Sequence, residues 1–274
     1  MKRALRSTLI YLAMGLCAAL FLVPLAFMVS TSLKPDGELF TETFAWIPDR
    51  LAWENYSKAI EVFPFWLYLK NTLIICVFTV FGTVVSSLCA SYAFAKLRWR
   101  GSGFWFAAML ATMMLPPQVT LLPVFLIFRK LGWIDTFLPL IVPTFFGSAF
   151  SIFLLRQFML TLPKELSDAA RLDGCSDWQI LWRIVAPLSR PAIVTVGLFA
   201  FVWSWTDFMG PLIYLNDAEK FTLAVGLQFF LGRHGEQWNL LMAAAVMATL
   251  PVAVLFFFAQ KKFVQGVATT GLRG

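Results

Sequence analysis

The segment from Leu166 to Pro187 reads LSDAARLDGCSDWQILWRIVAP, and this polar, charge-dense stretch lies between strongly apolar ones. Pro163, just before it, suits the first turn of a helix, and residues 164–173 are rich in helix-forming types. Gly174 is the residue type expected just past the C-terminus of a helix. The first half of the segment therefore predicts one short helix that ends at a glycine turn.

The second half of the segment carries the signal for another helix. Ser176 is followed three positions later by Gln179, which is the spacing of a capping box. A second helix is therefore expected to start at Asp177, to run through Ile184 and to stop before Pro187, because proline disrupts a helix interior. The whole segment predicts a helix, a glycine turn and another helix.

Small and charged side chains mark the first of these helices as a contact surface. Ala169 and Ala170 lack bulk, so the helix can approach another surface closely. Charges at its edge come from Asp168, Arg171 and Asp173. On physical grounds alone, a docking element and an ordinary cytoplasmic connector between membrane spans fit these residues equally well.

The spacing of the segment resembles the EAA loop of ABC importer permeases. That pattern is an acid, two alanines, three residues, glycine, nine residues, isoleucine, one residue, leucine and proline. Two positions depart from it, because Asp168 stands in place of glutamate and Ala186 in place of leucine, and the shorter acid leaves its contact open. The positions that fall in register are Asp168, Ala169, Ala170, Gly174, Ile184 and Pro187.

The resemblance implies both a fold and a role. The fold is an all-α polytopic membrane protein with six transmembrane helices, the type I ABC importer permease fold. The loop is then a coupling helix that sits in a cleft of a separate ATPase subunit and transmits its closure to the membrane helices. The residues to which the resemblance gives this ATPase-coupling role are Asp168, Ala169, Ala170, Arg171, Asp173, Gly174, Ile184 and Pro187.

The composition independently requires a membrane. Hydrophobic residues make up 59% of the 274 residues and charged residues only 14%, and the mean hydropathy is +0.76. An ordinary soluble domain carries about 25% charged residues. Because a spanning helix uses about 20 residues, the length fits several spans in one permease domain over residues 1–274. The expected spans are residues 8–30, 69–95, 104–128, 137–155, 192–215 and 240–259.

The third expected span contains Pro116, Pro117 and Pro123, which predict kinks or a broken helix. A membrane protein tolerates such breaks where neighbouring groups or water satisfy the freed backbone. The polar loop of residues 163–187 and the tail of residues 260–274 lie outside the spans.

Basic residues set the expected orientation, since lysine and arginine favour the cytoplasmic side of short loops. Six spans place both termini and residues 163–187 in the cytoplasm. The external segment of residues 32–70 is acidic, as expected, whereas Arg129 and Lys130 are a mild external exception. The first span is expected to be a retained helix, because the apolar stretch of residues 9–29 is too long for a signal peptide. The cytoplasmic cations are Lys2, Arg3, Arg6, Lys96, Arg98, Arg100, Lys261, Lys262 and Arg273.

The sequence lacks the motifs that other classes of function require. The net charge of +7 lies at span ends, which fits membrane topology and anionic lipid contact better than nucleic acid. No phosphate-binding GxxxxGK[ST] motif is present, so no cofactor is expected on this chain. The resemblance implies that ATP and magnesium are bound by a partner ATPase. The single histidine, His234, is expected to be a solvated surface residue. Neither a metal site nor a disulfide is expected from Cys17, Cys76, Cys89 and Cys175.

Further motifs are similar to the carbohydrate branch of these permeases, specifically the shorter six-span subunit of the maltose type. The resemblance implies a heterodimer with a second permease, two ATPase subunits, an extracytoplasmic solute-binding protein and a sugar substrate. The loop of residues 216–239 would reach toward the binding protein, and residues 263–274 would touch the ATPase dimer interface or form a disordered tail. The motifs are SYAFAKLR from Ser91, MLPPQVT from Met114, LGWIDT from Leu131, WTDF from Trp205 and FVQGVATTG from Phe263.

Sugars are held by aromatic faces and by side chains that hydrogen-bond hydroxyl groups, so the substrate-path candidates are Gln118, Trp203, Trp205 and Asp207. Interfacial tryptophan belts are the competing explanation, because the chain has 11 tryptophans. Asp207 is an ionisable residue within a span and therefore a functional hypothesis, with a gate or helix contact as open as ligand binding.

Two rival classes remain. An ion-coupled secondary transporter using Asp207 would require inverted repeats and further intramembrane charges, and a polytopic membrane enzyme would require a catalytic constellation at one depth. The sequence shows none of these features.

Overall fold

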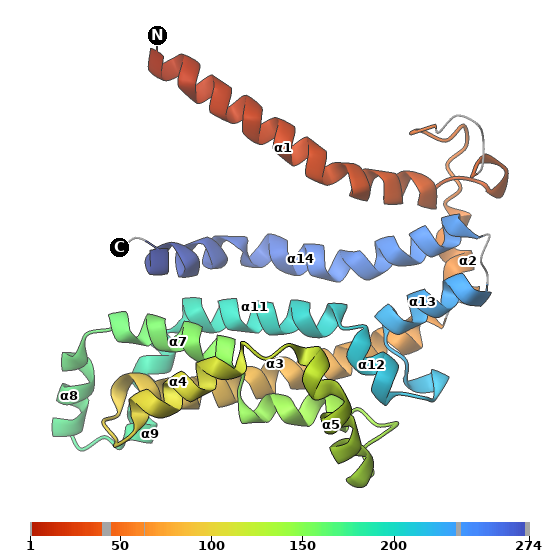
Figure 1. The fold of residues 1–274 in the computed structure, drawn as a ribbon. Helices are drawn as coiled ribbons and strands as arrows, with labels where there is room; N and C mark the ends of the chain where they lie inside the picture. Colours follow the sequence, from red (N-terminus) through yellow and green to blue (C-terminus); the bar gives the residue numbers. More distant parts are fainter. Residues whose placement is uncertain (1, 40–44, 63, 234–236, 272–274) are drawn as a thin grey trace. The chain divides into compact units, whose positions relative to one another are not determined.

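The computed structural model describes residues 2–39, 45–62, 64–233 and 237–271, and every regular element in them is helical (Figure 1). The chain divides into two compact units. The first comprises Met1–Leu67 with Gly226–Pro251, and the second comprises Tyr68–Val225 with Val252–Gly274.

The first unit contains α1 (Lys2–Ser32), the short helix η1 (Asp36–Glu38), α2 (Glu54–Val62) and the start of α14 (Trp238–Gly271). Two buried asparagines fix the turn after α1. The Asn55 side-chain amide donates to the carbonyl of Lys34 at 2.9 Å, and the Asn239 amide donates to the same carbonyl at 3.1 Å. The turn is therefore tied to both α2 and α14.

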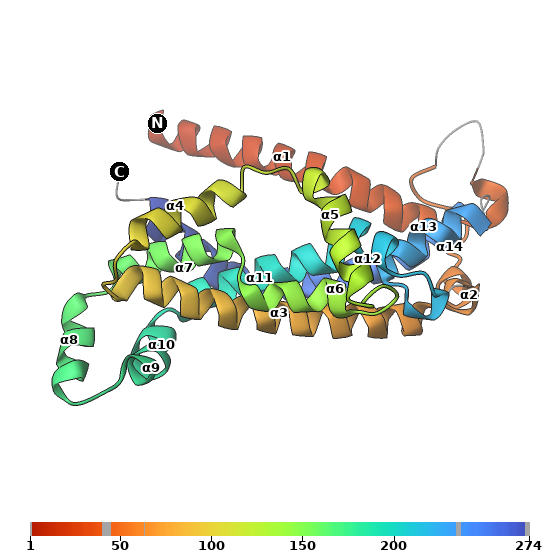
Figure 2. The same cartoon turned by 60° about the horizontal axis from the view of Figure 1, so that its bottom comes forward.

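The second unit holds the polar segment identified above. At one end of the unit lie α8 and α9, next to the ends of α3 and α7, and the short α12 lies toward the other end (Figures 1 and 2). Its elements are α3 (Phe65–Lys96), α4 (Ser102–Thr112), α5 (Pro117–Lys130), α6 (Leu138–Ile141), η2 (Val142–Phe146), α7 (Ala149–Thr161), α8 (Lys164–Leu172), α9 (Asp177–Ile180), the π-helical turn η3 (Leu181–Val185), α10 (Ala186–Leu188), α11 (Arg190–Thr206), α12 (Met209–Tyr214), η4 (Ala218–Lys220) and α13 (Leu223–Arg233), which crosses into the first unit.

The core of the second unit joins membrane helices to the polar segment. Side chains of α3, α7 and α11 pack directly against side chains of α8, α9, η3 and α10. Because these residues form one apolar cluster, the polar segment is built into the helix bundle. The buried members are Leu88, Tyr92, Leu155, Met159, Ala170, Ile180, Leu181, Val185, Ala186, Ala192 and Val196.

Four helices in the described residues are long and apolar enough to cross a membrane, and the number rises to six if each of two bent pairs is one span. The four are Arg6–Ser32, Phe65–Lys96, Leu138–Thr161 and Trp238–Ala259. The expected six-span arrangement is compatible with this range, and its count stays a prediction.

Proline breaks the third expected span as anticipated. The pair α4 and α5 is bent by 97° at the break between them. Pro116 is the N-cap of α5 and Pro117 occupies its first turn, where a missing N–H costs no helical hydrogen bond. Pro123 lies within α5 without ending it.

Some expectations fall on residues that the structure does not describe. His234 lies outside the described residues, as do residues 234–236 of the expected binding-protein loop and residues 272–274 of the tail. The described part of the tail, through Gly271, continues α14 as a helix.

Candidate functional site

The polar segment forms the predicted helix and glycine turn. Residue Gly174 has a φ of +81°, the left-handed conformation that favours glycine. Its N–H donates to the carbonyl of Arg171 at 3.0 Å, and the N–H of Cys175 donates to the carbonyl of Ala170 at 2.9 Å. These two bonds make a Schellman motif, which satisfies carbonyls left free at the end of α8.

The second helix starts as predicted but ends later. Ser176 Oγ accepts the N–H of Gln179 at 3.3 Å, and Gln179 Oε1 accepts the N–H of Ser176 at 2.8 Å, which confirms the capping box. The expected stop before Pro187 is wrong, because the helical run continues through η3 into α10. Pro187 lies in the first turn of α10, where its missing N–H is tolerated.

The two alanines of the segment have different surroundings. Ala170 is 6% exposed and belongs to the core of the second unit, where it packs with Ile180 and Met159. Ala169 is exposed. Of the two, only Ala169 is therefore available to another protein, while Ala170 holds α8 against its own bundle.

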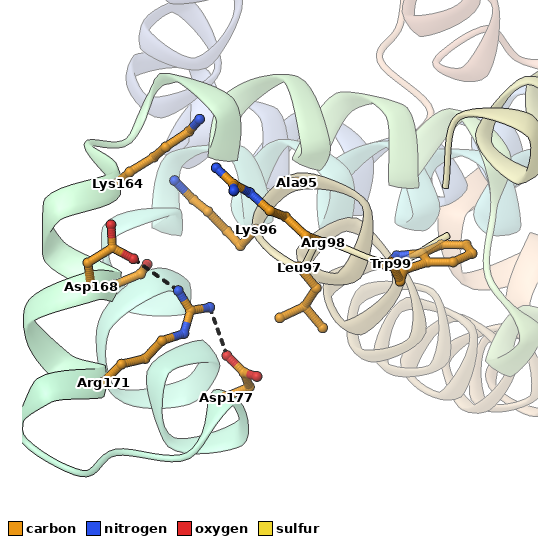
Figure 3. A pocket seen from close by; sticks show the side chains of 10 residues that line it. Ala95, Lys96, Leu97, Arg98, Trp99, Lys164, Asp168, Arg171 and Asp177 are labelled. Atoms are coloured by element: carbon orange, nitrogen blue, oxygen red, sulfur yellow. Dashed lines mark hydrogen bonds and ion pairs between the residues drawn. The ribbon is translucent and has the colours of Figure 1, made fainter. Parts of the chain in front are cut away.

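A charged network links α8 and α9 on the side of this element that faces α3. Arg171 pairs with Asp168 at 3.1 Å and with Asp177 at 3.0 Å (Figure 3). The hydroxyl of Tyr92 donates to Asp177 at 3.1 Å. The hydrogen bond to Asp177 raises the pKa of Arg171. Exposed ion pairs are worth roughly 0–1 kcal/mol each, so the network mainly fixes the orientation of α8 relative to α9.

The outer side of the element is apolar and exposed. We use the name docking surface for the exposed side chains Leu166, Ala169, Leu172 and Trp178. Leu172 is 90% exposed and Trp178 is 63% exposed. Exposed apolar side chains on two short helices indicate a protein contact. Among the other predicted coupling residues, Asp173, Gly174 and Pro187 are exposed and Ile184 is half-buried.

The fifth expected span is broken at a carboxylate. Asp207 lies between α11 and α12, and its Oδ1 accepts the N–H of Gly210 at 3.0 Å. A side chain at Gly210 would collide with this carboxylate. The break is therefore built around Asp207, which satisfies the backbone freed at the start of α12.

Only part of the predicted substrate path comes together. Trp203 and Asp207 both line a cavity of about 210 Å³ among α3, α11 and α12, together with hydroxyl groups such as that of Thr72. Trp205 is instead buried and stacks on Phe201. Gln118 is exposed on α5 and does not line this cavity.

Replacement of Asp207 with asparagine is expected to reduce transport without impairing assembly. The asparagine side-chain oxygen still accepts the N–H of Gly210, but the negative charge is lost. Uptake efficiency should fall about tenfold, because a hydrogen bond to a neutral amide is weaker than one to a carboxylate by about that factor. Initial uptake rates over a range of substrate concentrations measure this, with the amount of assembled complex as the control. Unchanged uptake kinetics would remove Asp207 from the candidates.

A second polar cluster on the expected external side was not assigned a role from the sequence, although Asp135 belongs to the quoted LGWIDT motif. Asp135 has a φ of +62°. Its Oδ1 accepts the N–H groups of Asn216 and Asp217, each at 3.0 Å, and Lys220 pairs with its Oδ2 at 2.6 Å. This cluster ties the loop after α5 to the loop after α12. The contacts of the Asp135 side chain are long-range, so no local signal predicts this cluster.

We call this cluster the Asp135 clamp, and substitution of Asp135 tests it. Alanine at this position removes acceptors for two backbone N–H groups, so the amides of Asn216 and Asp217 should exchange with solvent about tenfold faster. Asparagine tolerates the left-handed conformation and keeps one acceptor oxygen, so it should give an intermediate rate. Hydrogen exchange followed by mass spectrometry measures both. Equal protection in the alanine variant and the wild type would contradict the clamp.

The clamp is expected to be insensitive to mild acid. The hydrogen bond from Lys220, followed by the two backbone N–H groups, lowers the pKa of Asp135 to about 2. A carboxyl with a depressed pKa stabilises the fold above its unfolded pKa of about 3.9, and this contribution is lost as the pH falls toward the folded value. Protection of these amides should therefore stay constant from neutral pH down to about pH 4.

The chain is similar to known transport proteins over most of its length. The family described as "Binding-protein-dependent transport system inner membrane component" matches residues 82–269. The arabinooligosaccharides transport system permease protein AraQ of Bacillus subtilis is 34% identical, over 97% of this chain and 95% of that protein. The diacetylchitobiose uptake system permease protein DasC of Streptomyces coelicolor is 30% identical, over 92% of this chain and 91% of that protein.

Solved structures show the same architecture. A chain of a bacterial ABC transporter involved in the import of the acidic polysaccharide alginate matches with a TM-score of 0.84 and 25% identity, over 94% of this chain and 96% of that chain. A chain from a bacterial alginate ABC transporter in complex with an alginate pentasaccharide-bound periplasmic protein matches with a TM-score of 0.67 at 15% identity. The second likeness concerns the fold alone.

Proposed function

The chain belongs to the family of inner membrane components of binding-protein-dependent transport systems, and on this premise we propose that it is a permease subunit of an ATP-driven sugar importer. It forms half of the translocation path. Its partners are a second permease, two ATPase subunits and an extracytoplasmic solute-binding protein. Two relatives that match this chain over nearly their full length are named as sugar permeases, and they support sugar as the substrate class.

The observation that carries the proposal is the helix–turn–helix element of α8 and α9, which shares one core with the helix bundle. Its inner side is packed into the bundle through Ala170 and Ile180, while its outer side exposes Leu172 and Trp178. A force applied to such an element is passed to α3, α7 and α11, because they share one core. ATP and magnesium are bound by the ATPase, and closure of the two ATPase subunits moves α8 and α9 as one lever.

The proposed topology has six spans with both termini in the cytoplasm. The docking surface then faces the ATPase, and the loop after α12 faces the binding protein. Asp207 and Trp203 line the sugar path at the break in the fifth span. Transport is alternating access. The binding protein delivers the sugar at the external side of the membrane, and this delivery is coupled to closure of the ATPase at the cytoplasmic side.

The alternative of an ion-coupled secondary transporter has no support from the relatives. Their names describe transport-system and ABC-type permeases, and the family is that of binding-protein-dependent systems. Asp207 therefore needs no ion-coupling role.

Co-purification tests the proposal directly. The chain is tagged, extracted from its native membrane in mild detergent and analysed by mass spectrometry. We expect an ATPase, a second permease and a binding protein, and the binding protein then serves to screen sugars. Recovery of the chain alone or only as a homo-oligomer would overturn the proposal.

A further inference from the structure

A polar pocket of about 810 Å³ lies between the end of α3 and the element of α8 and α9 (Figure 3). Four cationic side chains but only two carboxylates line it. The lining side chains used in the argument are Lys96, Arg98, Lys164, Asp168, Arg171 and Asp177.

Both carboxylates of the pocket are already engaged. Asp168 and Asp177 each pair with Arg171, at 3.1 and 3.0 Å. Figure 3 shows this group on one side of the pocket and the charged ends of Lys96, Arg98 and Lys164 on the other. Among the pocket-lining residues, no unpaired carboxylate therefore remains for the other three cations.

Two of these cations also affect each other. The ammonium groups of Lys96 and Lys164 repel each other, and Glu165 and Asp168 attract Lys96 without forming an ion pair with it among the described residues. Lys96 donates to the carbonyl of Leu162 at 2.8 Å, which holds it in place. Neither Arg98 nor Lys164 makes an ion pair within the described part of the chain. An anion between these groups would relieve the repulsion.

The pocket lies at the level where a membrane helix ends. Lys96 is the last residue of the apolar helix Phe65–Lys96, and Trp99 follows with its indole N–H donating to the carbonyl of Ala93 at 3.2 Å. Tryptophan and basic residues at a span end are typical of the lipid headgroup region. In the proposed topology, on which this step rests, that region belongs to the cytoplasmic leaflet, whose surface is anionic.

We propose that this pocket binds the phosphate group of an anionic phospholipid of the cytoplasmic leaflet. Arg98 offers a guanidinium fork that matches two phosphate oxygens, and Lys96 and Lys164 act as compact charges beside it. Inorganic phosphate shares this chemistry, but the position at the end of a membrane helix favours the lipid.

The lipid site and the docking surface lie on different sides of α8. The pocket-lining residues of α8 are Lys164, Ser167, Asp168 and Arg171, which recur every three or four positions and therefore share one helix face. Ala169 and Leu172 do not line the pocket. An ATPase on the docking surface would thus leave the pocket-lining face of α8 uncovered, and a bound lipid would contact the opposite face of the same helix.

The test counts lipids on the complete complex. Complexes are reconstituted in vesicles of phosphatidylcholine and phosphatidylglycerol, extracted gently, and analysed by native mass spectrometry. The double variant Arg98→Gln with Lys164→Gln should bind phosphatidylglycerol about 30-fold more weakly than the wild type. The matched control, Arg100→Gln with Arg183→Gln, removes two exposed cations that do not line the pocket and should retain the lipid.

The other possible outcomes distinguish the lipid proposal from its alternatives and from the proposed function. Equal phosphatidylglycerol retention in the two double variants would overturn the proposal. Binding of inorganic phosphate at the same residues without retained phospholipid would also overturn the lipid source. Loss of the ATPase from the Arg98/Lys164 variant with unchanged lipid retention would assign the pocket to a protein partner. Absence of an ATPase from the wild-type chain would refute the proposed function, whereas lipid counting on the isolated chain would still test the pocket.

Discussion

Replacement of Gly174 with valine should reduce sugar uptake at least about tenfold while leaving the chain in the membrane. The left-handed conformation costs an ordinary L-residue about 1–2 kcal/mol and a β-branched residue more, and 1.4 kcal/mol shifts an equilibrium tenfold. A Cβ at this position has no atom within 4 Å, so the substitution changes the backbone preference without a clash. Uptake of labelled sugar, normalised to the amount of chain in the membrane, measures the effect.

Asparagine at position 174 is the matched control. It adds a side chain but tolerates the left-handed conformation, so its uptake should remain close to that of the wild type. Wild-type uptake in the valine variant would refute the role of the turn. A loss of similar size in both variants would show that side-chain volume, rather than φ, matters at this position.

Replacement of Ala169 with leucine should release or uncouple the ATPase. The side chain of Ala169 is exposed, so added bulk leaves the chain's own core intact and acts only on a partner that packs against α8. Overpacking a close contact costs about 1–3 kcal/mol, which corresponds to a loss of ATPase binding of about tenfold or more. Co-purified ATPase per permease and ATP hydrolysis by the complex measure the loss.

The matched control for Ala169 is an exposed alanine in another part of the chain. Ala218, in η4, is also exposed, and its replacement with leucine should leave ATPase recovery unchanged. Ala170 is unsuitable because it is 6% exposed and would disturb the core. Full ATPase recovery and normal hydrolysis in the Ala169 variant would contradict a close approach at α8.

Local signals predicted the helix–turn–helix element of α8 and α9 well. Proline before α8, glycine after it and the Ser176–Gln179 pair each act within a few residues, and the structure shows the corresponding caps and turn. The apolar composition likewise predicted a helical membrane protein. These features were accessible because they depend on backbone chemistry at short range.

Other features depended on partners that are distant in sequence. Asp135 contacts residues 81 to 85 positions later, and Arg171 turns inward because Asp177 and Tyr92 lie beside it. The division between the buried Ala170 and the exposed Ala169 follows from packing against Met159 and its neighbours, which no local pattern contains. The helix continues past Pro187 because a π-helical turn precedes it, and that turn has no reliable local signature.

The π-helical turn η3 also determines the direction in which α9 presents its side chains. One residue in an α-helix corresponds to a rotation of about 100°, and a π-helical turn holds one residue more than an α-helical turn. The extra residue therefore sets the angular phase of α9 relative to α10, before the chain bends by 82° into α11. Regularising Leu181–Val185 into an α-helix would rotate the exposed tryptophan of α9 away from its present direction, even with every helix length and cap preserved.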